Sequence, residues 1–204
     1  MPTTFRQNIV DIFGELGEDW LSSLSTLTQV LAQQYQLTDL QPVENMSFNY
    51  VMSGFKDEKP IILKLGLNKT AIALEVSCLN AFANHGAPEV IAHEPGMVLM
   101  ERATPGTTLK TYFPNQEKQA IDIFCKSLKR LHASTIPLQH DFQPLKSLLL
   151  VLDEDVNIPT HQLSTARQLR DNLLNSTNKN VLLHGDLHHE NILINDNGWL
   201  VIDP

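Results

Sequence analysis

The stretch 181–204 constrains the fold of this chain more than any other segment. Two wholly apolar runs, 181–183 and 192–194, are each bounded by polar residues. Apolar runs of this length between turn residues are typical of buried strands, so we expect a strand at each. His184-Gly185-Asp186 follows the first run and predicts a tight corner that carries Asp186 at its end.

The second apolar run leads into a hairpin. Asn195-Asp196-Asn197-Gly198 is a strong hairpin turn, because Asn and Gly accept positive φ at little cost. The returning strand, 199–202, is expected to bring Asp203 back to the level of Asn191. Two oxygen-bearing side chains are therefore predicted to lie close together.

Asp186, Asn191 and Asp203 together form the set that a phosphoryl-transfer enzyme needs. One carboxylate must lie near the acceptor hydroxyl, while an amide oxygen and a second carboxylate hold magnesium against the nucleotide phosphates. We therefore take Asp186 as the candidate catalytic residue, and Asn191 and Asp203 as candidate metal ligands. The same residues also fit an ordinary hairpin with polar ends, although their intervals favour the catalytic interpretation.

This pattern resembles the catalytic loop and metal-binding triplet of kinases, in the version found in small-molecule antibiotic kinases. His184-Gly185-Asp186 stands where protein kinases have His-Arg-Asp, and Asp203-Pro204 stands where they have Asp-Phe-Gly. More narrowly, the chain is similar to the aminoglycoside/hydroxyurea antibiotic resistance kinase family. Shorter similarities follow in order along almost the whole chain: Phe13-Gly14-Glu15, Trp20-Leu21, Ser47-Phe48-Asn49-Tyr50-Val51, Leu63-Lys64-Leu65-Gly66, Gly86-Ala87-Pro88, Met100-Glu101-Arg102-Ala103, Pro105-Gly106 and Leu183 to His189.

The resemblance implies an α+β, protein kinase-like fold with two lobes. A small β-rich nucleotide lobe with an N-terminal helical segment would span 1–102, and a helical catalytic lobe, missing its final helices, would span 103–204. Apolar spacing agrees with that order, since strands and one helix come first and helices follow. The expected helices are 5–35 (interrupted near Gly14 and Gly17), 71–84, 115–133, 144–153 and 160–175, and the expected early strands are 47–55, 61–65, 90–92 and 97–100.

Lys64 and Glu75 fit the kinase scheme. Lys64 ends an apolar strand, where its ammonium could reach the α- and β-phosphates. Glu75 lies early in the next expected helix and could hold Lys64 by an ion pair. Most lysines and glutamates are solvated, so a surface role is the alternative for each.

Two further nucleotide contacts are implied by the resemblance. No G-x-G-x-x-G motif lies between the first strands, where 44–49 stands instead, and Ser47 could hydrogen-bond phosphate there. A plain strand entrance explains Ser47 equally well. Residues 100–103 would form the hinge that binds adenine, which makes Met100 and Arg102 candidate nucleotide-binding residues. A linker role is the alternative for this segment, and Thr104-Pro105-Gly106 is typical of an inter-lobe connector.

The implied function is ATP- and Mg²⁺-dependent phosphorylation of a hydroxyl on a small molecule, with an aminoglycoside of the streptomycin type as the leading acceptor. A kinase of another metabolite, of the sugar, choline or homoserine type, is one alternative. A nucleotide-binding remnant without catalysis is another.

Family members continue beyond the Asp-Pro pair. We therefore expect either a naturally shortened product or a fragment, with an incomplete acceptor site and poor or absent turnover. The apolar run 200–202 is expected to be uncovered and to favour self-association.

Composition limits the partners and the location of the protein. The chain has 204 residues, 42% of them hydrophobic, and a net charge of −8. An acidic chain argues against nucleic acid as a partner. It suits a polycationic acceptor, although acidity also maintains solubility. No apolar stretch is long enough to cross a membrane, and Cys78 and Cys125 are expected to be buried reduced thiols, which indicates the cytoplasm.

Overall fold

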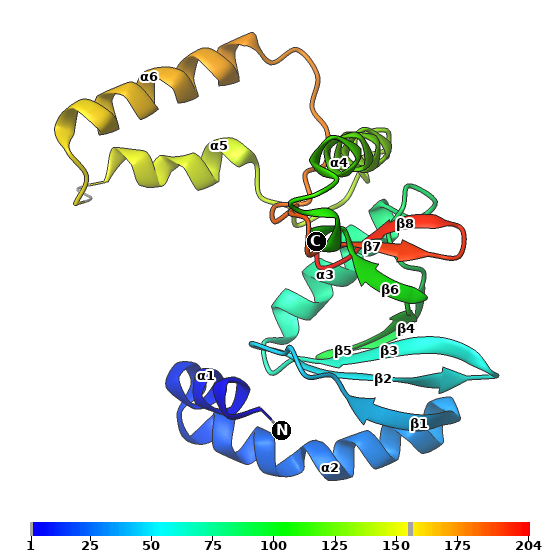
Figure 1. The fold of residues 1–204 in the computed structure, drawn as a ribbon. Coiled ribbons are helices and arrows are strands. Elements are labelled where there is room, and N and C mark those ends of the chain that lie inside the picture. Colours follow the sequence, from blue (N-terminus) through cyan, green and yellow to red (C-terminus); the bar gives the residue numbers. More distant parts are fainter. Residues whose placement is uncertain (1, 155–156) are drawn as a thin grey trace.

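The computed structural model describes residues 2–154 and 157–204 of the chain. Its architecture is α+β: a five-stranded sheet, a three-stranded sheet and a set of helices follow one another (Figure 1). Among these described residues, no helix combines the length and the apolarity that a membrane crossing requires.

The five-stranded sheet is antiparallel throughout and has the strand order β1-β2-β3-β5-β4. Its strands are β1 (Leu37–Pro42), β2 (Tyr50–Lys56), β3 (Lys59–Leu65), β4 (Val90–Glu94) and β5 (Met97–Glu101). Because side chains alternate across a strand, Leu63 and Leu65 of β3 face one side of the sheet and Lys64 faces the other. Strand β1 is not predicted from the sequence, because it has no alternating apolar pattern: only Leu37 in it is buried.

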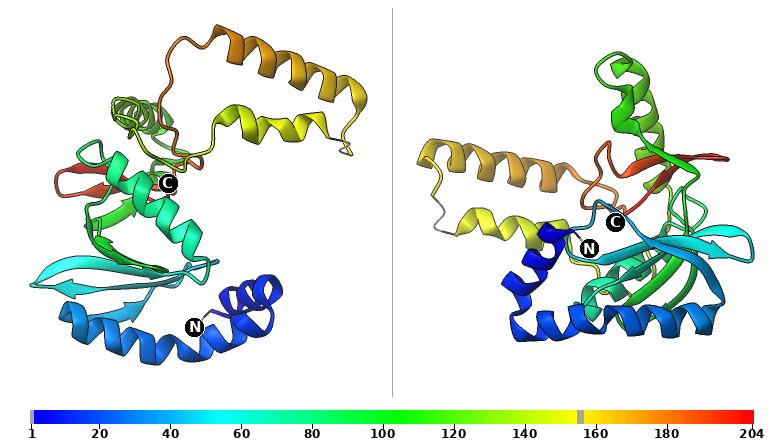
Figure 2. Two further views of the ribbon diagram at one scale, coloured as in Figure 1. Left: turned by 180° about the vertical axis from the view of Figure 1, so that it is seen from behind. Right: turned by 60° about the horizontal axis from the view of Figure 1, so that its bottom comes forward.

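Two N-terminal helices, α1 (Thr3–Phe13) and α2 (Glu15–Tyr35), cover the first face of this sheet. Phe5 and Ile9 of α1 and Leu24 of α2 share a core with Leu63. Figure 2 shows α2 lying along the sheet. The break between the helices falls at Gly14, which has a positive φ of 57°. Gly17 lies inside α2 instead of interrupting it, and the Ile9 carbonyl comes too close there to leave room for a side chain.

Helix α3 (Lys69–Ala81) covers the opposite face of the sheet. The side chain of Asn68 caps its N-terminus by accepting a hydrogen bond from the Ala71 N–H at 3.1 Å. Its buried side contributes Ile72, Val76 and Leu79 to a core shared with the second half of the chain. Glu75 is also on this buried side, so the helix carries a carboxylate toward the sheet.

The second sheet has the order β6-β7-β8 and is antiparallel. The β7 (Ile192–Asn195) and β8 (Gly198–Val201) pair confirms the predicted hairpin. The Thr104–Gly106 connector of the sequence prediction runs into β6 (Pro105–Thr108), which pairs with β7.

The prediction of a strand at 181–183 is wrong. These residues lie outside any strand; Leu182 is buried in the core, whereas Leu183 is 42% exposed. The physical reason is that a strand needs a hydrogen-bonded partner: β6 and β8 occupy both sides of β7, and among the described residues no strand pairs with 181–183.

The expectation of an uncovered apolar run at 200–202 is also wrong. Val201 is only 1% exposed and belongs to the main core, and Leu200 and Ile202 are partly buried. The backbone N–H of Val201 donates to the Gly86 carbonyl at 2.7 Å, which ties β8 to the loop after α3.

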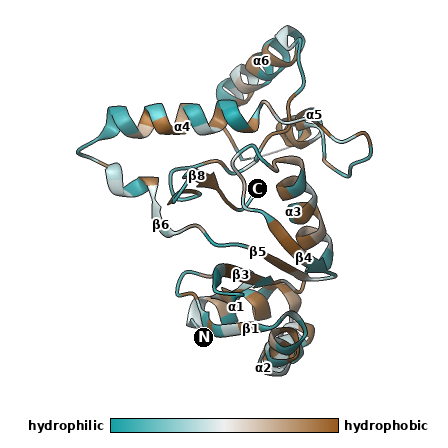
Figure 3. Ribbon diagram, turned by 90° about the vertical axis from the view of Figure 1, so that its right-hand side faces the viewer, coloured by the Kyte–Doolittle hydropathy of each residue, from teal (hydrophilic) through white to brown (hydrophobic). Residues whose placement is uncertain are grey.

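The remaining helices form an arm that projects from the second sheet (Figures 1 and 2). Helix α4 (Glu117–Leu131) follows the short η1 (Leu109–Tyr112) and packs on β8. The arm beyond it consists of α5 (Leu145–Leu148), η2 (Leu149–Asp153) and α6 (Thr160–Ser176). Helix α6 buries only Leu163, and its hydropathy is mixed in Figure 3.

Candidate active site

A buried lysine joins the two halves of the molecule. The Nζ atom of Lys64 lies 2.7 Å from Oε1 of Glu75 and 2.9 Å from Oδ1 of Asp203, which is 139 residues further along the chain. Lys64 is 7% exposed and Glu75 is 8% exposed. These three residues, the Lys64 group, bring β3, α3 and the end of β8 together.

The charges in the Lys64 group influence one another. Burial by itself lowers the pKa of the Lys64 ammonium, but the carboxylates of Asp203 and Glu75 outweigh this effect, and the pKa is raised overall. Burial raises the pKa of Glu75, and the Lys64 ammonium opposes that only in part. The pKa of Glu75 is therefore raised as well, chiefly by burial.

The loop that carries Asp186 is held by hydrogen bonds from two neighbours. The Asn191 side chain donates through Nδ2 to the Asp186 carbonyl at 3.0 Å, which leaves the amide oxygen of Asn191 available as a ligand. The Asp186 N–H donates to Nδ1 of His184 at 3.3 Å. His184 therefore anchors this loop, and the Asp186 carboxylate itself stays exposed.

His184 also fixes the backbone beside Asp203. Since Nδ1 accepts a hydrogen bond, Nε2 carries the proton and donates to the Ile202 carbonyl at 2.9 Å. Burial lowers the pKa of His184, which favours this neutral form. The Ile202 N–H donates to the Asn191 carbonyl at 3.0 Å. Asp203 follows with a φ of 59°, a conformation that Asp tolerates better than most residues.

Asp186, Asn191 and Asp203 are thus brought together as the sequence predicts. Hydrogen bonds link Asn191 to Asp186 and Asn191 to the residue before Asp203. Asp203 in turn contacts Lys64.

His188 and its neighbours lie next to Asp186. Nε2 of His188 is 3.7 Å from Oδ2 of Asp186, and its Nδ1 accepts a hydrogen bond from the Glu190 N–H at 3.2 Å. Ligand atoms of His188, His189 and Glu190 lie within 4.8 Å of one another. Lys110 holds the Glu190 carboxylate at 2.6 Å and lowers its pKa.

Asn195, which the sequence predicts only as part of a turn, contacts one residue within the predicted hinge at 100–103 and one directly after it. Asn195 accepts a hydrogen bond from the Thr104 N–H at 3.0 Å and donates to Oε1 of Glu101 at 3.0 Å. Met100 is buried on the same face of the sheet as Lys64, because it pairs with Ile62 across β3 and β5. The hairpin pattern predicts where Asn195 lies, but no nearby sequence pattern predicts its hydrogen bonds to Thr104 and Glu101.

Ser47 and Arg102 lie apart from the hydrogen bonds of the Lys64 group. Ser47 is exposed in the loop between β1 and β2, where its carbonyl accepts a hydrogen bond from Asn8 at 3.0 Å. Arg102 is exposed, and its N–H donates to the Pro60 carbonyl at 3.2 Å. Within the described residues no hydrogen bond joins Ser47 or Arg102 to the Lys64 group.

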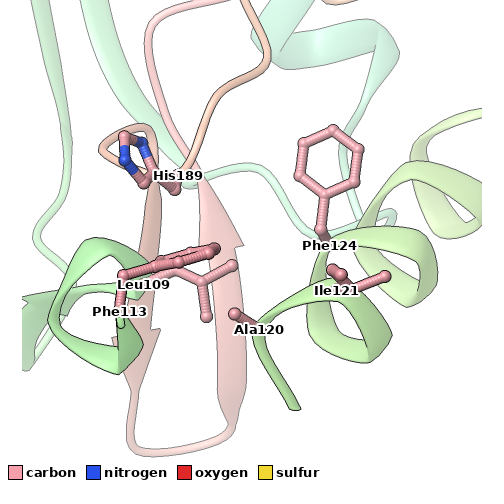
Figure 4. A pocket seen from close by; sticks show the side chains of 6 residues that line it. All are labelled: Leu109, Phe113, Ala120, Ile121, Phe124 and His189. Carbon is pink, nitrogen blue, oxygen red and sulfur yellow. The ribbon is translucent and has the colours of Figure 1, made fainter. Parts of the chain in front are cut away.

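A shallow apolar pocket of about 110 Å³ lies near the Asp186 loop but outside the Lys64 group. Figure 4 shows His189 and Phe113 on one side of it and Phe124 on α4 on the other. Its six lining residues are Leu109, Phe113, Ala120, Ile121, Phe124 and His189.

The arrangement of the two sheets and helices is a protein kinase-like fold. Residues 36–204 match the family described as aminoglycoside/hydroxyurea antibiotic resistance kinase, and the chain belongs to this family. It is 40% identical over 128 residues to a streptomycin 3''-kinase of Klebsiella pneumoniae, a match that covers 58% of this chain and 45% of that protein. The chain thus spans about half the length of this curated relative.

Solved structures show the same fold. The chain is similar to aminoglycoside phosphotransferase APH(4)-Ia with a TM-score of 0.58 at 16% identity, over 88% of this chain and 71% of that one. It is also similar to choline kinase LicA from Streptococcus pneumoniae, with a TM-score of 0.61 at 17% identity, over 89% of this chain and 68% of that one.

Proposed function

We propose that the protein is an ATP-dependent phosphotransferase that acts on a hydroxyl of a small molecule, with a streptomycin-like aminoglycoside as the acceptor. The observation that carries the proposal is the Lys64 group, in which a buried lysine meets Glu75 and Asp203. Membership of a family of antibiotic resistance kinases supports it. We propose residues 1–102 as the nucleotide lobe and 103–204 as the catalytic lobe.

The side chains present suit ATP and magnesium. Mg²⁺ prefers hard oxygen ligands, and the Asn191 amide oxygen and the Asp203 carboxylate supply two of them. Lys64 offers an ammonium to phosphate oxygens while Glu75 holds it in place. Magnesium, when bound, neutralises charge on the phosphate oxygens. Structures of a mutant of the similar phosphotransferase contain ADP or AMP-PNP with hygromycin B.

In this proposal Asp186 orients the acceptor hydroxyl and takes up its proton. Transfer through a loose transition state depends on positioning more than on strong base chemistry, which suits an exposed carboxylate on an anchored loop. The backbone of the hinge at Met100 and Arg102 would bind adenine, and Ser47 would contact phosphate from its loop.

The charge and the cysteines fit the proposed setting. A net charge of −8 would attract a cationic aminoglycoside. Cys78 and Cys125 are both free, although Cys125 is exposed and not buried as the sequence predicts. We place the protein in the cytoplasm on this basis. Self-association remains a prediction, which size-exclusion chromatography over a range of concentrations would measure.

Transfer of the γ-phosphate to a panel of acceptors tests the proposal. Purified chain is incubated with radiolabelled ATP, Mg²⁺ and streptomycin, or with choline or a sugar alcohol. We expect at most weak labelling of streptomycin by the parent chain, in keeping with the poor turnover expected from its sequence, and none by Asp186→Asn or Asp203→Asn. Equal labelling by the parent and both variants would remove the assignment.

Binding of nucleotide is measured in parallel. Mg²⁺-dependent binding without transfer to any acceptor would favour a nucleotide-binding protein over an enzyme. Transfer to choline alone would contradict the proposed aminoglycoside acceptor but would support the proposed phosphotransferase activity.

A further inference from the structure

The loop after α3, helix α4 and strand β8 are joined to one another by three hydrogen bonds. The Val201 N–H donates to the Gly86 carbonyl at 2.7 Å. The guanidinium of Arg130 donates through Nη2 to the Trp199 carbonyl. Nδ1 of His85 donates to the Arg130 carbonyl at 3.1 Å. Arg130 thus contacts both the loop and the strand, and we call these contacts the Arg130 latch.

Gly86 and Arg130 fit each other closely. Gly86 is buried and has a φ of 96°, which disfavours other residues. The Arg130 guanidinium occupies the space where a Cβ of residue 86 would lie. Burial also lowers the pKa of Arg130 without removing its charge, in keeping with an enclosed guanidinium. A side chain at position 86 would therefore displace the latch.

The latch and the Lys64 group connect the same two elements at different points. Helix α3 carries Glu75 and leads to Gly86, while β8 contains Trp199 and Val201 and leads to Asp203. The Lys64 group joins Glu75 to Asp203, and the Arg130 latch joins Gly86 to β8. Because the Arg130 latch contacts β8 only a few residues before Asp203, a shift of β8 at the latch would move Asp203 relative to Lys64.

We propose that Arg130 is a positioning residue of the nucleotide site, which acts through Gly86 and β8 to hold Asp203 in reach of Lys64. The effect on magnesium-nucleotide binding rests on the proposed function. The effect on the position of Asp203 does not, so the two are tested separately.

The first experiment needs no nucleotide. NMR spectra of the full chain are compared among the parent, Arg130→Ala and Lys126→Ala. Lys126 is the control, because it lies on α4 and lines one cavity with Arg130 but makes none of the latch contacts. We expect the Asp203 amide and Lys64 side-chain signals to shift in Arg130→Ala only. If Arg130→Ala does not fold, Arg130→Lys takes its place, since lysine keeps the positive charge but lacks the planar guanidinium with its several N–H donors. Unshifted Asp203 and Lys64 signals in a folded Arg130 variant would overturn the proposal.

The second experiment measures ADP affinity with and without Mg²⁺. Removing a residue that orients a metal ligand typically lowers affinity about 10–100-fold, so we expect that loss in Arg130→Ala with Mg²⁺ and little change without it. Equal losses in both conditions would overturn the proposal, since they would indicate a general defect of the fold. A parent chain that binds no nucleotide contradicts the proposed function and leaves the first experiment to decide the role of Arg130.

Rescue adds a readout that a merely structural role would not move. Arg130 lines a cavity of about 290 Å³ together with Ser127 and Trp199, so a small cation can reach the vacated position in Arg130→Ala. Guanidinium ions at millimolar concentration are expected to restore part of the Mg²⁺-dependent affinity, whereas tetramethylammonium is not. Restoration by both ions alike, or by neither, would count against the latch.

Discussion

The two sides of the Lys64–Asp203 contact hold their charged residues by different means. Lys64 and Glu75, on the five-stranded side, are enclosed by packed side chains and are less than a tenth exposed. Asp203 and Asp186, on the three-stranded side, have exposed carboxylates, and hydrogen bonds to the backbone hold them instead. The charges on the five-stranded side are thus fixed through their side chains, whereas those on the three-stranded side are fixed through their main chain.

Lys64→Met tests the buried side most severely. The change leaves the Glu75 carboxylate buried without its partner, so we expect a loss of about 4 kcal/mol in the free energy of unfolding. Urea denaturation measures it. Lys64→Met combined with Glu75→Gln should recover part of the loss, because the unpaired charge is gone. If the single variant were as stable as the parent, burial would not be what holds this pair.

The packing difference between the two regions predicts unequal costs for one substitution. Leu99 in β5 is 0% exposed, whereas Leu173 in α6 is 65% exposed. Leu99→Ala should destabilise the protein by about 3 kcal/mol, because it leaves a cavity in the core. Leu173→Ala should stay within about 0.5 kcal/mol of the parent. Thermal and urea unfolding of the pair check this, and equal costs would contradict the contrast.

His184→Gln examines the backbone network of the exposed side. We expect a loss of about 1.5 kcal/mol, because hydrogen bonds to Ile202 and Asp186 are broken. In the parent, the pKa of His184 is lowered below its ordinary value of 6.5. The unfolded chain therefore binds the proton more readily, and stability falls as the pH drops below 6.5. Unfolding measured above and below this pH should show that dependence in the parent and a weaker one in the variant.

Among the changes to charged and hydrogen-bonding residues, Asp203→Asn should have the smallest effect on stability. The Asp203 side chain is half exposed, and exposed ion pairs contribute at most about 1 kcal/mol. Mg²⁺-dependent nucleotide binding should nevertheless be lost with this carboxylate. A stability loss as large as that of Lys64→Met would show that the two sides do not differ as described.

Local patterns predicted the parts of the fold that local chemistry decides. The hairpin of β7 and β8 follows from the Asn-Asp-Asn-Gly turn, and the helices α3, α4 and α6 follow from apolar spacing. Together with the kinase resemblance, these patterns also predicted that Asp186, Asn191 and Asp203 lie close together.

Contacts between distant segments were beyond such patterns. The run 181–183 has the composition of a strand, but no strand in the described part of the chain pairs with it. Strand β1 has too few buried residues to signal itself. The hydrogen bonds of Asn195 to the hinge and the Arg130 latch depend on how the two sheets meet, which no short segment records.

The pairing of β7 with β8 has a consequence for how the chain can vary. Ile192 lies opposite Val201, both are buried, and Asp203 follows two residues later. Adding one residue within either strand would turn the Val201 side chain outward and move the Asp203 carboxylate away from Lys64. Length changes should therefore be tolerated only at the tip of the hairpin, where the alternation of inward and outward side chains is left intact.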